Sequence, residues 1–433
     1  MTVPLPQPAA QAGPQPTAGA AGPAGRSLFR RRPVLVAFTV AAVVAAGGAT
    51  ATALVFGPSA AGLGRPTAAV TPAAPPPAAP LPTVELVGVA VGGRAPVGVP
   101  AVIRATSGTI IGVTGSGPDG TTVTGAVGSD GTWTSSTGLV PSAEYGFVAQ
   151  VTDTNGANRS VPLTVTTGAP PKVLAVTVSP GDGAVVGVGQ AVSVRLGTPV
   201  KDKAARAEVE RRLTVTAVPA VVGAWHWVGD SELRYRAETF WAAGTTVNVS
   251  AALDRLQAAP GVWGQGTRTV AFTVGSALTS VVDTQSHMMT VSKNGQVLRV
   301  MKASTGKPQF PTRNGTFVVL EKFADLVMDS STVNLPPGTP AYKTAVKDAV
   351  RITNSGTFVH GAPWSVGSQG RENVSHGCVN LSPADADWFF GVATRGDVVT
   401  VVNSTTGPAV SDAGAQDWNM TFDQWKAGSA LAA

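Results

Sequence analysis

The sequence predicts a mainly β protein, and its composition and patterning both point that way. The chain of 433 residues contains 51 glycines and 34 prolines, and only 13% of its residues are charged. Short runs of β-favouring residues alternate with Gly, Ser and Asp turns over much of the chain after residue 83. This combination favours strands and turns over helical bundles. The length allows several domains, each with its own core.

Charge and cysteine content exclude two classes of protein. The formal net charge is +6, but residues 1–34 carry four arginines and no acidic residue, so the rest of the chain is only +2. No basic stripe interleaved with aromatic residues appears in that remainder, and we expect no nucleic-acid partner. The single cysteine, Cys378, excludes an intramolecular disulfide. A free thiol in an exported protein is best explained by catalysis.

The N-terminal part predicts export. Residues 1–33 are rich in Pro, Ala, Gly and Gln and predict a disordered cytoplasmic tail. Residues 34–57 are uncharged and long enough to cross a bilayer, and the arginines before them predict an anchor with its C-terminal side outside. A cleaved signal peptide ending near Ala51-Thr-Ala53 is the alternative. Residues 58–82 form a Pro/Ala linker of polyproline type.

Two immunoglobulin-like β-sandwich domains are expected next, at residues 83–169 and 170–276. Their strands and turns recur at the spacing of such sandwiches, although no cysteine pair supports a true immunoglobulin domain. One helix is expected in the second domain, with Thr198 as N-cap, Pro199 in its first turn and a charged face to Arg212. In Trp225-His226-Trp227, alternation places His226 on the face opposite the two tryptophans, as a surface or edge residue.

The third region, residues 277–403, carries the reactive groups. Asn294-Gly295 between two alternating runs predicts a β-hairpin. Ser382 and Pro383 predict the N-cap and first turn of a short helix. The tail, residues 404–433, holds Trp418, Phe422 and Trp425, and we expect it to pack on this third domain because a free tail would not keep so many aromatic residues.

Two of the four histidines lie close in sequence to the only cysteine. His376 precedes Cys378 by two residues, and His360 lies sixteen residues before His376. A thiol attacks as the thiolate, and an imidazole can take its proton, so the pattern predicts cysteine acyl-transfer chemistry. Two other interpretations are a buried structural cysteine and a zinc site formed by these three side chains. The zinc site lacks an obvious glutamate base and the usual ligand spacing.

The segment Ser375-His-Gly-Cys-Val-Asn380, with His360-Gly-Ala-Pro-Trp364 upstream, resembles the catalytic motif of the L,D-transpeptidases, the YkuD-type domain. The resemblance extends over residues 277–428. It includes the turns at 304–307 and 311–316, the segment 328–332 and the Arg395-Gly-Asp397 entry to the last strand. A membrane segment followed by two immunoglobulin-like domains is similar to the actinobacterial members.

The resemblance implies a role for each matching residue. Cys378 would be the nucleophile and His360 its base, with the main-chain carbonyl of Gly361 orienting the imidazole where many members have a serine. His376 would support the electrostatics, and the N–H groups of Gly377 and Cys378 would form the oxyanion hole with the Tyr342 hydroxyl. Asn380 would brace the loop around the nucleophile. The substrate-binding set implied for the family is Tyr342, Met328, Trp364, Ser375 and Asn380.

The reaction implied is peptidoglycan cross-linking without a cofactor or metal. Cys378 would release the terminal D-Ala of a tetrapeptide stem, and the resulting thioester would pass its acyl group to the diaminopimelate side-chain amine of another stem, giving a 3→3 cross-link. The implied partners are these stem peptides, carbapenem β-lactams as inhibitors and the cytoplasmic membrane, and the implied location is the cell envelope. Alternatives are L,D-carboxypeptidase activity, attachment of a protein, and a non-catalytic wall-binding protein.

Overall fold

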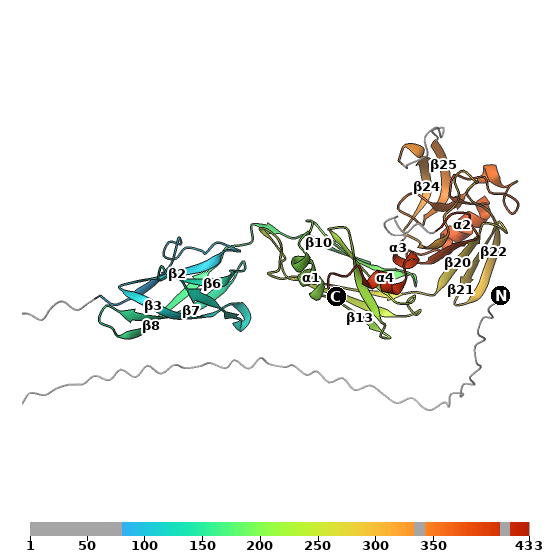
Figure 1. Cartoon of the computed structure of the whole chain (residues 1–433). Helices are drawn as coiled ribbons and strands as arrows, with labels where there is room; N and C mark the ends of the chain where they lie inside the picture. Colours follow the sequence, from blue (N-terminus) through green and yellow to red (C-terminus); the bar gives the residue numbers. More distant parts are fainter. Residues whose placement is uncertain (1–79, 333–342, 408–415, 433) are drawn as a thin grey trace, which may run out of the picture. The chain divides into compact units, whose positions relative to one another are not determined.

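The computed structural model describes residues 80–332, 343–407 and 416–432 (Figure 1). The predicted tail, membrane segment and linker, residues 1–82, lie almost entirely outside this range. Within the described residues, no helix is both long and apolar enough to cross a membrane.

The first region, from residue 83 to 166, contains two four-stranded sheets, in the orders β1-β2-β6-β5 and β4-β3-β7-β8. In β7, Tyr145, Phe147, Ala149 and Val151 are buried and alternate with more exposed residues, as expected for a strand with one face in a core. Trp133 packs edge-on against Phe147, with ring centroids 5.6 Å apart. The elements are β1 (Thr83–Leu86), β2 (Pro100–Thr106), β3 (Gly108–Ser116), η1 (Pro118–Gly120), β4 (Thr122–Val123), β5 (Gly125–Val127), β6 (Trp133–Gly138), β7 (Glu144–Asp153) and β8 (Asn158–Thr166).

The second region, from residue 172 to 274, has sheets in the orders β10-β12-β15-β14, β11-β19-β16-β13 and β17-β18-β9. Its elements are β9 (Lys172–Val173), β10 (Val176–Ser179), β11 (Val185–Val186), β12 (Val192–Leu196), α1 (Lys203–Arg211), β13 (Leu213–Val218), β14 (Gly223–Val228), β15 (Glu232–Ala237), β16 (Thr246–Ala252), β17 (Gln257–Ala259), β18 (Val262–Trp263) and β19 (Thr267–Val274).

The helix α1 is present, but its predicted start is wrong. It begins at Lys203, and Asp202 is the N-cap, whose carboxylate accepts a hydrogen bond from the Ala205 N–H at 2.8 Å. A carboxylate satisfies a free N–H at this position as well as a hydroxyl does, and it also favours the positive end of the helix dipole. The Thr198 hydroxyl is instead buried without a hydrogen bond to any described group.

The third region has a nine-stranded sheet in the order β23-β28-β20-β21-β22-β27-β26-β25-β24. The predicted hairpin at Asn294-Gly295 joins β21 and β22, and both residues have positive φ, as a tight hairpin turn requires. The predicted caps of α2 are confirmed: Ser382 is its N-cap and Pro383 its first residue. The elements are β20 (Leu278–Asp283), β21 (Met288–Lys293), β22 (Gln296–Ser304), β23 (Gly315–Val318), β24 (Glu321–Asp329), η2 (Ser330–Thr332), β25 (Lys343–Arg351), β26 (Phe358–Gly361), η3 (Pro363–Ser365), β27 (Val379–Leu381), α2 (Pro383–Val392) and β28 (Val398–Val402).

The C-terminal segment contacts more than the third domain, so the expectation for it was incomplete. Its helices are α3 (Gln416–Asn419) and α4 (Phe422–Lys426). Asn419 exchanges hydrogen bonds with the backbone of Thr316 on β23, as expected for packing on the third domain. The fully buried Trp425, however, donates its indole N–H to the Ala224 carbonyl on β14 of the second sandwich.

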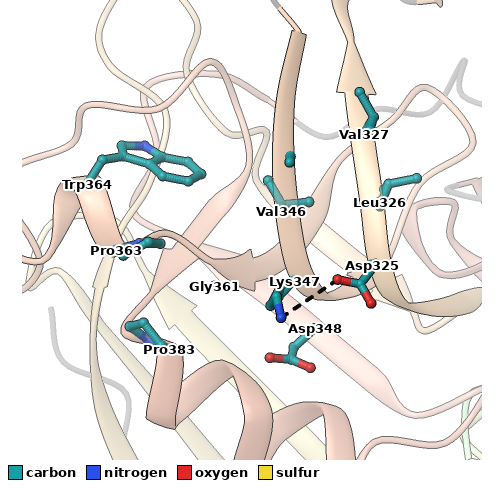
Figure 2. A pocket seen from close by; sticks show the side chains of 11 residues that line it. Asp325, Leu326, Val327, Val346, Lys347, Asp348, Gly361, Pro363, Trp364 and Pro383 are labelled. Atoms are coloured by element: carbon teal, nitrogen blue, oxygen red, sulfur yellow. Dashed lines mark ion pairs between the residues drawn. The ribbon is translucent and has the colours of Figure 1, made fainter.

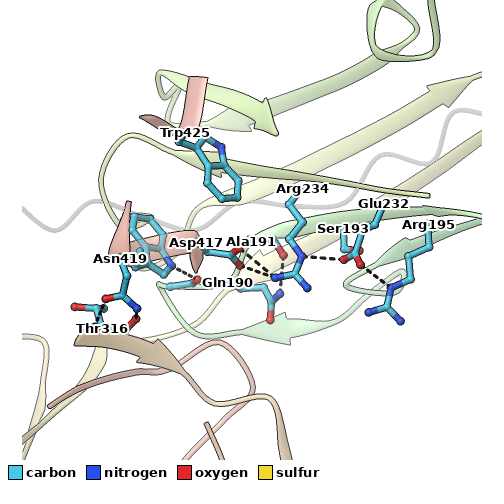
Figure 3. A network of polar contacts seen from close by, with 12 residues as sticks. Gln190, Ala191, Ser193, Arg195, Glu232, Arg234, Thr316, Asp417, Asn419 and Trp425 are labelled. Atoms are coloured by element: carbon cyan, nitrogen blue, oxygen red, sulfur yellow. Dashed lines mark hydrogen bonds and ion pairs between the residues drawn. The ribbon is translucent and has the colours of Figure 1, made fainter. Parts of the chain in front are cut away.

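Polar contacts reinforce this junction (Figure 3). The Arg234 guanidinium of β15 lies 3.1 Å from the Asp417 carboxylate of α3 and 2.8 Å from Glu232, and all three side chains are largely buried. The His226 ring stacks on Trp425 with centroids 4.5 Å apart, and its Nδ1 donates to the Trp425 carbonyl. His226 does lie opposite Trp225 and Trp227, as alternation predicted. Its partner is the C-terminal helix rather than solvent.

Candidate functional site

The positions of His360 and Cys378 follow from one pair of parallel strands. Strand β26 pairs with β27 so that His360 lies beside Asn380 and Val359 beside Val379. Val359 and Val379 face the main apolar core of the domain. Because side chains alternate along a strand, His360 points to the opposite face. Cys378, which directly precedes β27, joins a second apolar cluster with Phe358 on that face. The register therefore places two residues that are eighteen positions apart on the same face, in neighbouring segments of the sheet.

His360 is held in one orientation and one tautomer. Its side chain is buried, and its Nδ1 lies 3.0 Å from the carbonyl oxygen of Gly361. A carbonyl oxygen can only accept, so Nδ1 carries the proton and, in the neutral ring, Nε2 presents a lone pair. Burial lowers the pKa of His360, although the bond to Gly361 raises it in part. The imidazole is therefore neutral near pH 7 and able to accept a proton.

Cys378 is a partly buried thiol without a charged neighbour. Its Sγ donates to the Gly356 carbonyl at 3.8 Å, and the apolar cluster around it contains Phe323, Leu326 and Met328. Burial raises the pKa of the thiol to about 11, against a smaller opposing contribution from the Phe358 backbone. The resting pair is thus a neutral thiol and a neutral imidazole. A thiolate at this sulfur therefore requires a base that takes the proton.

The loop before Cys378 is shaped by the Ser375 hydroxyl. Ser375 Oγ donates to the Cys378 carbonyl at 2.6 Å and accepts from the Gly377 N–H at 3.0 Å. Gly377 has a φ of +119°, a conformation that side-chain-bearing residues rarely adopt. The N–H of Cys378 makes no hydrogen bond to any described residue. One of the two expected oxyanion donors is therefore engaged within the loop, and the other is available.

Asn380 connects the cysteine loop to the turn after His360. It is buried, and its side-chain amide donates to Ser365 Oγ at 3.1 Å. Ser365 in turn donates to the Ala362 carbonyl, and Gln369 donates to both. These bonds fix η3, which carries Trp364 with 57% of its surface exposed. The resemblance implied the brace from Asn380, whereas Ser365 and Gln369 carry no signal in the sequence that could have identified them.

His376 lies on the exposed side of the same loop. Its ring packs against Phe310 with centroids 4.8 Å apart, and the Lys307 ammonium lies 5.2 Å from the Phe310 ring centre. Burial and, to a smaller extent, the positive charge of Lys307 lower the pKa of His376. The 304–312 segment that supplies these residues is anchored by Thr312, whose hydroxyl accepts from Gly306 N–H and donates to Gly377 O. Lys307 and Thr312 lie in the two turns that the family resemblance includes, 304–307 and 311–316, but the resemblance implied no role for either residue.

The remaining expected substrate contacts divide into three groups. Met328 is half-buried in the cluster that contains Cys378, which suits a residue lining a cleft. Ser375 and Asn380 use their side chains within the protein, so their place is in positioning the loop. Tyr342, expected to donate to the oxyanion, lies outside the described residues. In the described part of the chain, no group of three or more His, Cys, Asp or Glu side chains is arranged to hold a metal ion.

A groove lies next to this site and is lined in part by Gly361, the residue after His360 (Figure 2). Its volume is about 430 Å³, and it lies between the β24–β25 hairpin, the η3 turn and the start of α2. Leu326 and Val346 line it and also belong to the cluster that contains Cys378. The other lining residues are Asp325, Val327, Ala345, Lys347, Asp348, Gly361, Pro363, Trp364 and Pro383.

Two regions of the chain match known protein families. Residues 278–401 match the L,D-transpeptidase catalytic domain and residues 93–257 a bacterial Ig domain. The chain is 38% identical over 338 residues to L,D-transpeptidase 2 of Mycobacterium tuberculosis, covering 78% of this chain and 82% of that protein. It is 42% identical over 227 residues to L,D-transpeptidase 1 of the same species, covering 52% and 84%. A solved structure of L,D-transpeptidase 3 from that organism is 34% identical, covering 53% and 99%, with a TM-score of 0.45.

A β-rich protein with a histidine on one strand of a parallel pair and a thiol directly before the other fits an acyltransferase. The chain belongs to the L,D-transpeptidase family, which the long sequence matches establish. It is an acyltransferase of the cell wall that acts outside the cytoplasm.

Proposed function

We propose that this L,D-transpeptidase works through a thioester on Cys378, with His360 as the general base. The observation that carries the proposal is the β26–β27 register, which puts both side chains on one face of adjacent strands. The hydrogen bond from His360 Nδ1 to Gly361 adds support because it leaves Nε2 to act as the base. Removal of a proton from a neutral thiol by a neutral imidazole is the expected first event.

The reaction then proceeds in two balanced steps. Cys378 sulfur attacks the carbonyl carbon before the terminal D-Ala while its proton passes to His360. The C–N bond breaks, and D-Ala leaves with that proton on its amine. In the second step an acceptor amine attacks the thioester carbonyl and its proton passes to His360. The C–S bond then breaks, and His360 returns that proton to the sulfur to restore the thiol. The energy of the original peptide bond is conserved in the thioester, so no nucleotide is required.

Charge develops on the carbonyl oxygen in both steps, and we assign its stabilisation first to the Cys378 N–H. A donor without another partner can turn to the oxyanion at little cost, and one such donor contributes about a hundredfold or more in rate. The Gly377 N–H would contribute only if it released Ser375 Oγ. The Tyr342 hydroxyl is the third donor that the family resemblance implies. His376 lies close enough in sequence to add electrostatic support to the same loop.

The substrates proposed are two peptidoglycan stems, with a tetrapeptide as donor and a diaminopimelate side-chain amine as acceptor, giving a 3→3 cross-link. To test this, we would incubate the full chain with disaccharide-tetrapeptide and measure the products by mass spectrometry, beside Cys378→Ala. A dimer lacking one D-Ala, formed only by the wild type, is the expected result. If tripeptide formed without dimer, the activity would be that of a carboxypeptidase rather than a transpeptidase. No conversion would favour a wall-binding protein.

Carbapenems are the inhibitors we propose, since a strained β-lactam carbonyl can acylate the same thiol. The L,D-transpeptidase LdtMt1, which is 41% identical to this chain, has a solved structure in complex with imipenem. The expected result is a mass increase equal to the carbapenem on the wild type and none on Cys378→Ala. An equal mass increase on both proteins would mean that the carbapenem reacts with a residue other than Cys378.

Residues 34–57 are proposed as the anchor that keeps the enzyme at the cytoplasmic membrane. Their uncharged composition after a cluster of arginines supports this. The test is N-terminal sequencing of the protein recovered from membranes: an intact N-terminus supports an anchor, and a start near residue 53 supports a cleaved signal peptide.

A further inference from the structure

We propose that the groove between the β24–β25 hairpin and Trp364 is the binding site for the acceptor stem, which it recognises through the ammonium group of that stem. This inference rests on the proposed function and adds the side from which the second substrate arrives. Neither Cys378 nor His360 lines the groove, although Leu326 and Val346 belong both to its wall and to the cluster that contains Cys378.

The walls of the groove are apolar, and large apolar side chains on them are exposed to solvent, as is common in a ligand-binding site. Trp364 and Val327 are 57% and 61% exposed, and Pro363 and Pro383 complete the wall (Figure 2). An exposed tryptophan in a concave apolar site is a common feature of ligand recognition. The face of an indole also attracts a cation, and the attraction is strongest when the ammonium is partly desolvated.

The charges of the groove favour a cation over an anion. It is lined by the carboxylates of Asp325 and Asp348 and by one ammonium, that of Lys347, which pairs with Asp325 at 3.9 Å. Asp348 makes no ion pair or hydrogen bond with any described residue. Burial, followed by the negative charge of Asp387, raises the pKa of Asp348, although the Lys347 ammonium lowers it in part. An incoming ammonium would relieve this crowding of like charges.

The backbone brings Asp348 to the groove by an irregularity of the strand. Lys347 pairs with Gly361 and Val350 with Val359, so two residues of β25, Asp348 and Ala349, lie opposite His360 alone. A bulge of this kind redirects a side chain and is common beside active sites. Asp348 also has a φ of +53°, a conformation that a residue other than glycine adopts at a cost. The strained residue is therefore the one that carries the unpaired carboxylate.

One end of the groove reaches the base. Trp364 lines the groove, and its ring centroid lies 6.1 Å from that of His360. Gly361 lines it too, and its carbonyl holds the His360 ring. An amine that moves along Trp364 would therefore meet the imidazole that must remove its proton before the C–N bond forms. The acceptor amine is an ammonium near pH 7, so the groove would collect it in that form and release it toward His360.

Binding can be measured without turnover. In a Cys378→Ala background, we would titrate a disaccharide-tripeptide, which carries the acceptor amine but has no terminal D-Ala to release. Adding Asp348→Asn should weaken its binding by a factor of about 5–10, because asparagine keeps an oxygen acceptor but loses the negative charge that strengthens the hydrogen bond. Asparagine tolerates the positive φ as well as aspartate does, so the backbone is preserved. Acetylation of the acceptor amine should weaken binding similarly and abolish the difference between the two proteins.

Asp387→Asn is the matched control because it removes one negative charge next to the groove but does not line it. We expect its affinity for the tripeptide to stay within about twofold of the background. Equal affinity of the background and Asp348→Asn proteins would overturn the inference, as would equal weakening by both substitutions. Failure of the proposed function would be seen separately, as absence of a tetrapeptide-derived acyl group on the wild-type protein.

Discussion

Arg234 and Asp417 are buried against each other with opposite charges, whereas His360 and Cys378 are buried with no counter-charge. At the first pair, burial alone would lower the pKa of Arg234, but the carboxylates of Asp417 and Glu232 raise it. At the second pair, burial dominates, and both side chains are driven to their neutral forms. No charged group in the described part of the chain contributes to either shift at the second pair.

The difference separates residues that stabilise from residues that react. A buried ion pair is satisfied as it stands, and losing one partner leaves an uncompensated charge. A buried neutral thiol beside a neutral imidazole is tolerated at rest and acquires charge only when sulfur attacks. Cys378 and His360 should therefore be needed for activity, while Arg234 and Asp417 should be needed for folding. Substitutions at each pair test this difference, through their effects on activity and on stability.

The largest expected effect is that of Cys378→Ala on activity. Dimer formation should fall by at least about a thousandfold, because the thioester can no longer form. Stability should change by only about 1 kcal/mol, since Cys378 has no charged partner and alanine removes a single buried atom. Product analysis and guanidinium denaturation measure the two quantities. Residual activity above one hundredth of the wild type would show that another group is the nucleophile.

The next effect is on stability. Asp417→Ala should lower the free energy of unfolding by about 1.5–3 kcal/mol, because the buried Arg234 would lose one of its two carboxylate partners and keep only Glu232. Denaturant titration followed by tryptophan fluorescence measures this, and Trp418 and Trp425 nearby should report the same transition. Asp423→Asn is the control: it removes a carboxylate from the fully exposed pair with Lys426 and should leave unfolding unchanged. If both substitutions changed the free energy of unfolding equally, the pair of Arg234 and Asp417 would not behave as a buried ion pair.

The pH dependence sharpens the comparison at the reactive pair. Because the thiol pKa is about 11, alkylation of Cys378 by iodoacetamide should still be accelerating above pH 9, where an ordinary cysteine is already half ionised. Quenching the alkylation at intervals and measuring the modified protein by mass spectrometry gives the rate at each pH. A plateau below pH 8 would instead indicate a thiolate–imidazolium pair at rest.

The same shifts affect stability, with signs that follow from linkage. The folded state lowers the pKa of His360 from 6.5. The contribution of this group to stability is therefore fully present above pH 6.5, and it is lost at lower pH because the unfolded chain binds the proton first. The folded state raises the pKa of Cys378 from 9.0 to about 11, so stability falls as pH rises through that interval. Denaturation of Cys378→Ala should lack the alkaline loss, and its persistence would assign the loss to another group.

The smallest expected effect is that of Gly361→Ala. A Cβ at this position would meet Ala386 and the Lys347 carbonyl at 3.4 Å, which is ordinary contact, and the residue has no positive φ. The carbonyl that holds His360 belongs to the main chain and would remain. We expect stability to rise by about 0.4–1 kcal/mol with activity within about twofold of the wild type. A large loss of activity would show that the flexibility of glycine is required there.

Much of the site was accessible from sequence because its chemistry depends on rare residues. One cysteine and two nearby histidines limited the choice, and the family resemblance supplied the role of the Gly361 carbonyl that the structure places on His360 Nδ1. The helix caps Ser382 and Pro383 were predicted because both act through the local backbone. Local signals of this kind need no knowledge of the tertiary fold.

Other features depend on contacts between distant segments, which the sequence does not encode locally. Asp348 is an ordinary residue in a β run until a bulge opposite His360 gives it a positive φ. The partner of His226 is Trp425, about two hundred residues away, so alternation gave its face but not its contact. The N-cap of α1 was misplaced because Thr198 and Asp202 are both suitable caps, and the choice depends on where the chain leaves β12.

The most direct test of the central claim is to find where the acyl group is attached. The full chain would be mixed with disaccharide-tetrapeptide, quenched in acid within seconds and digested, and the peptides would be mapped by mass spectrometry. We predict a tripeptide-derived acyl group on Cys378, with one D-Ala released, and its disappearance when a disaccharide-tripeptide acceptor is added. An acyl group on any other residue, or dimer formed with none on Cys378, would contradict the account.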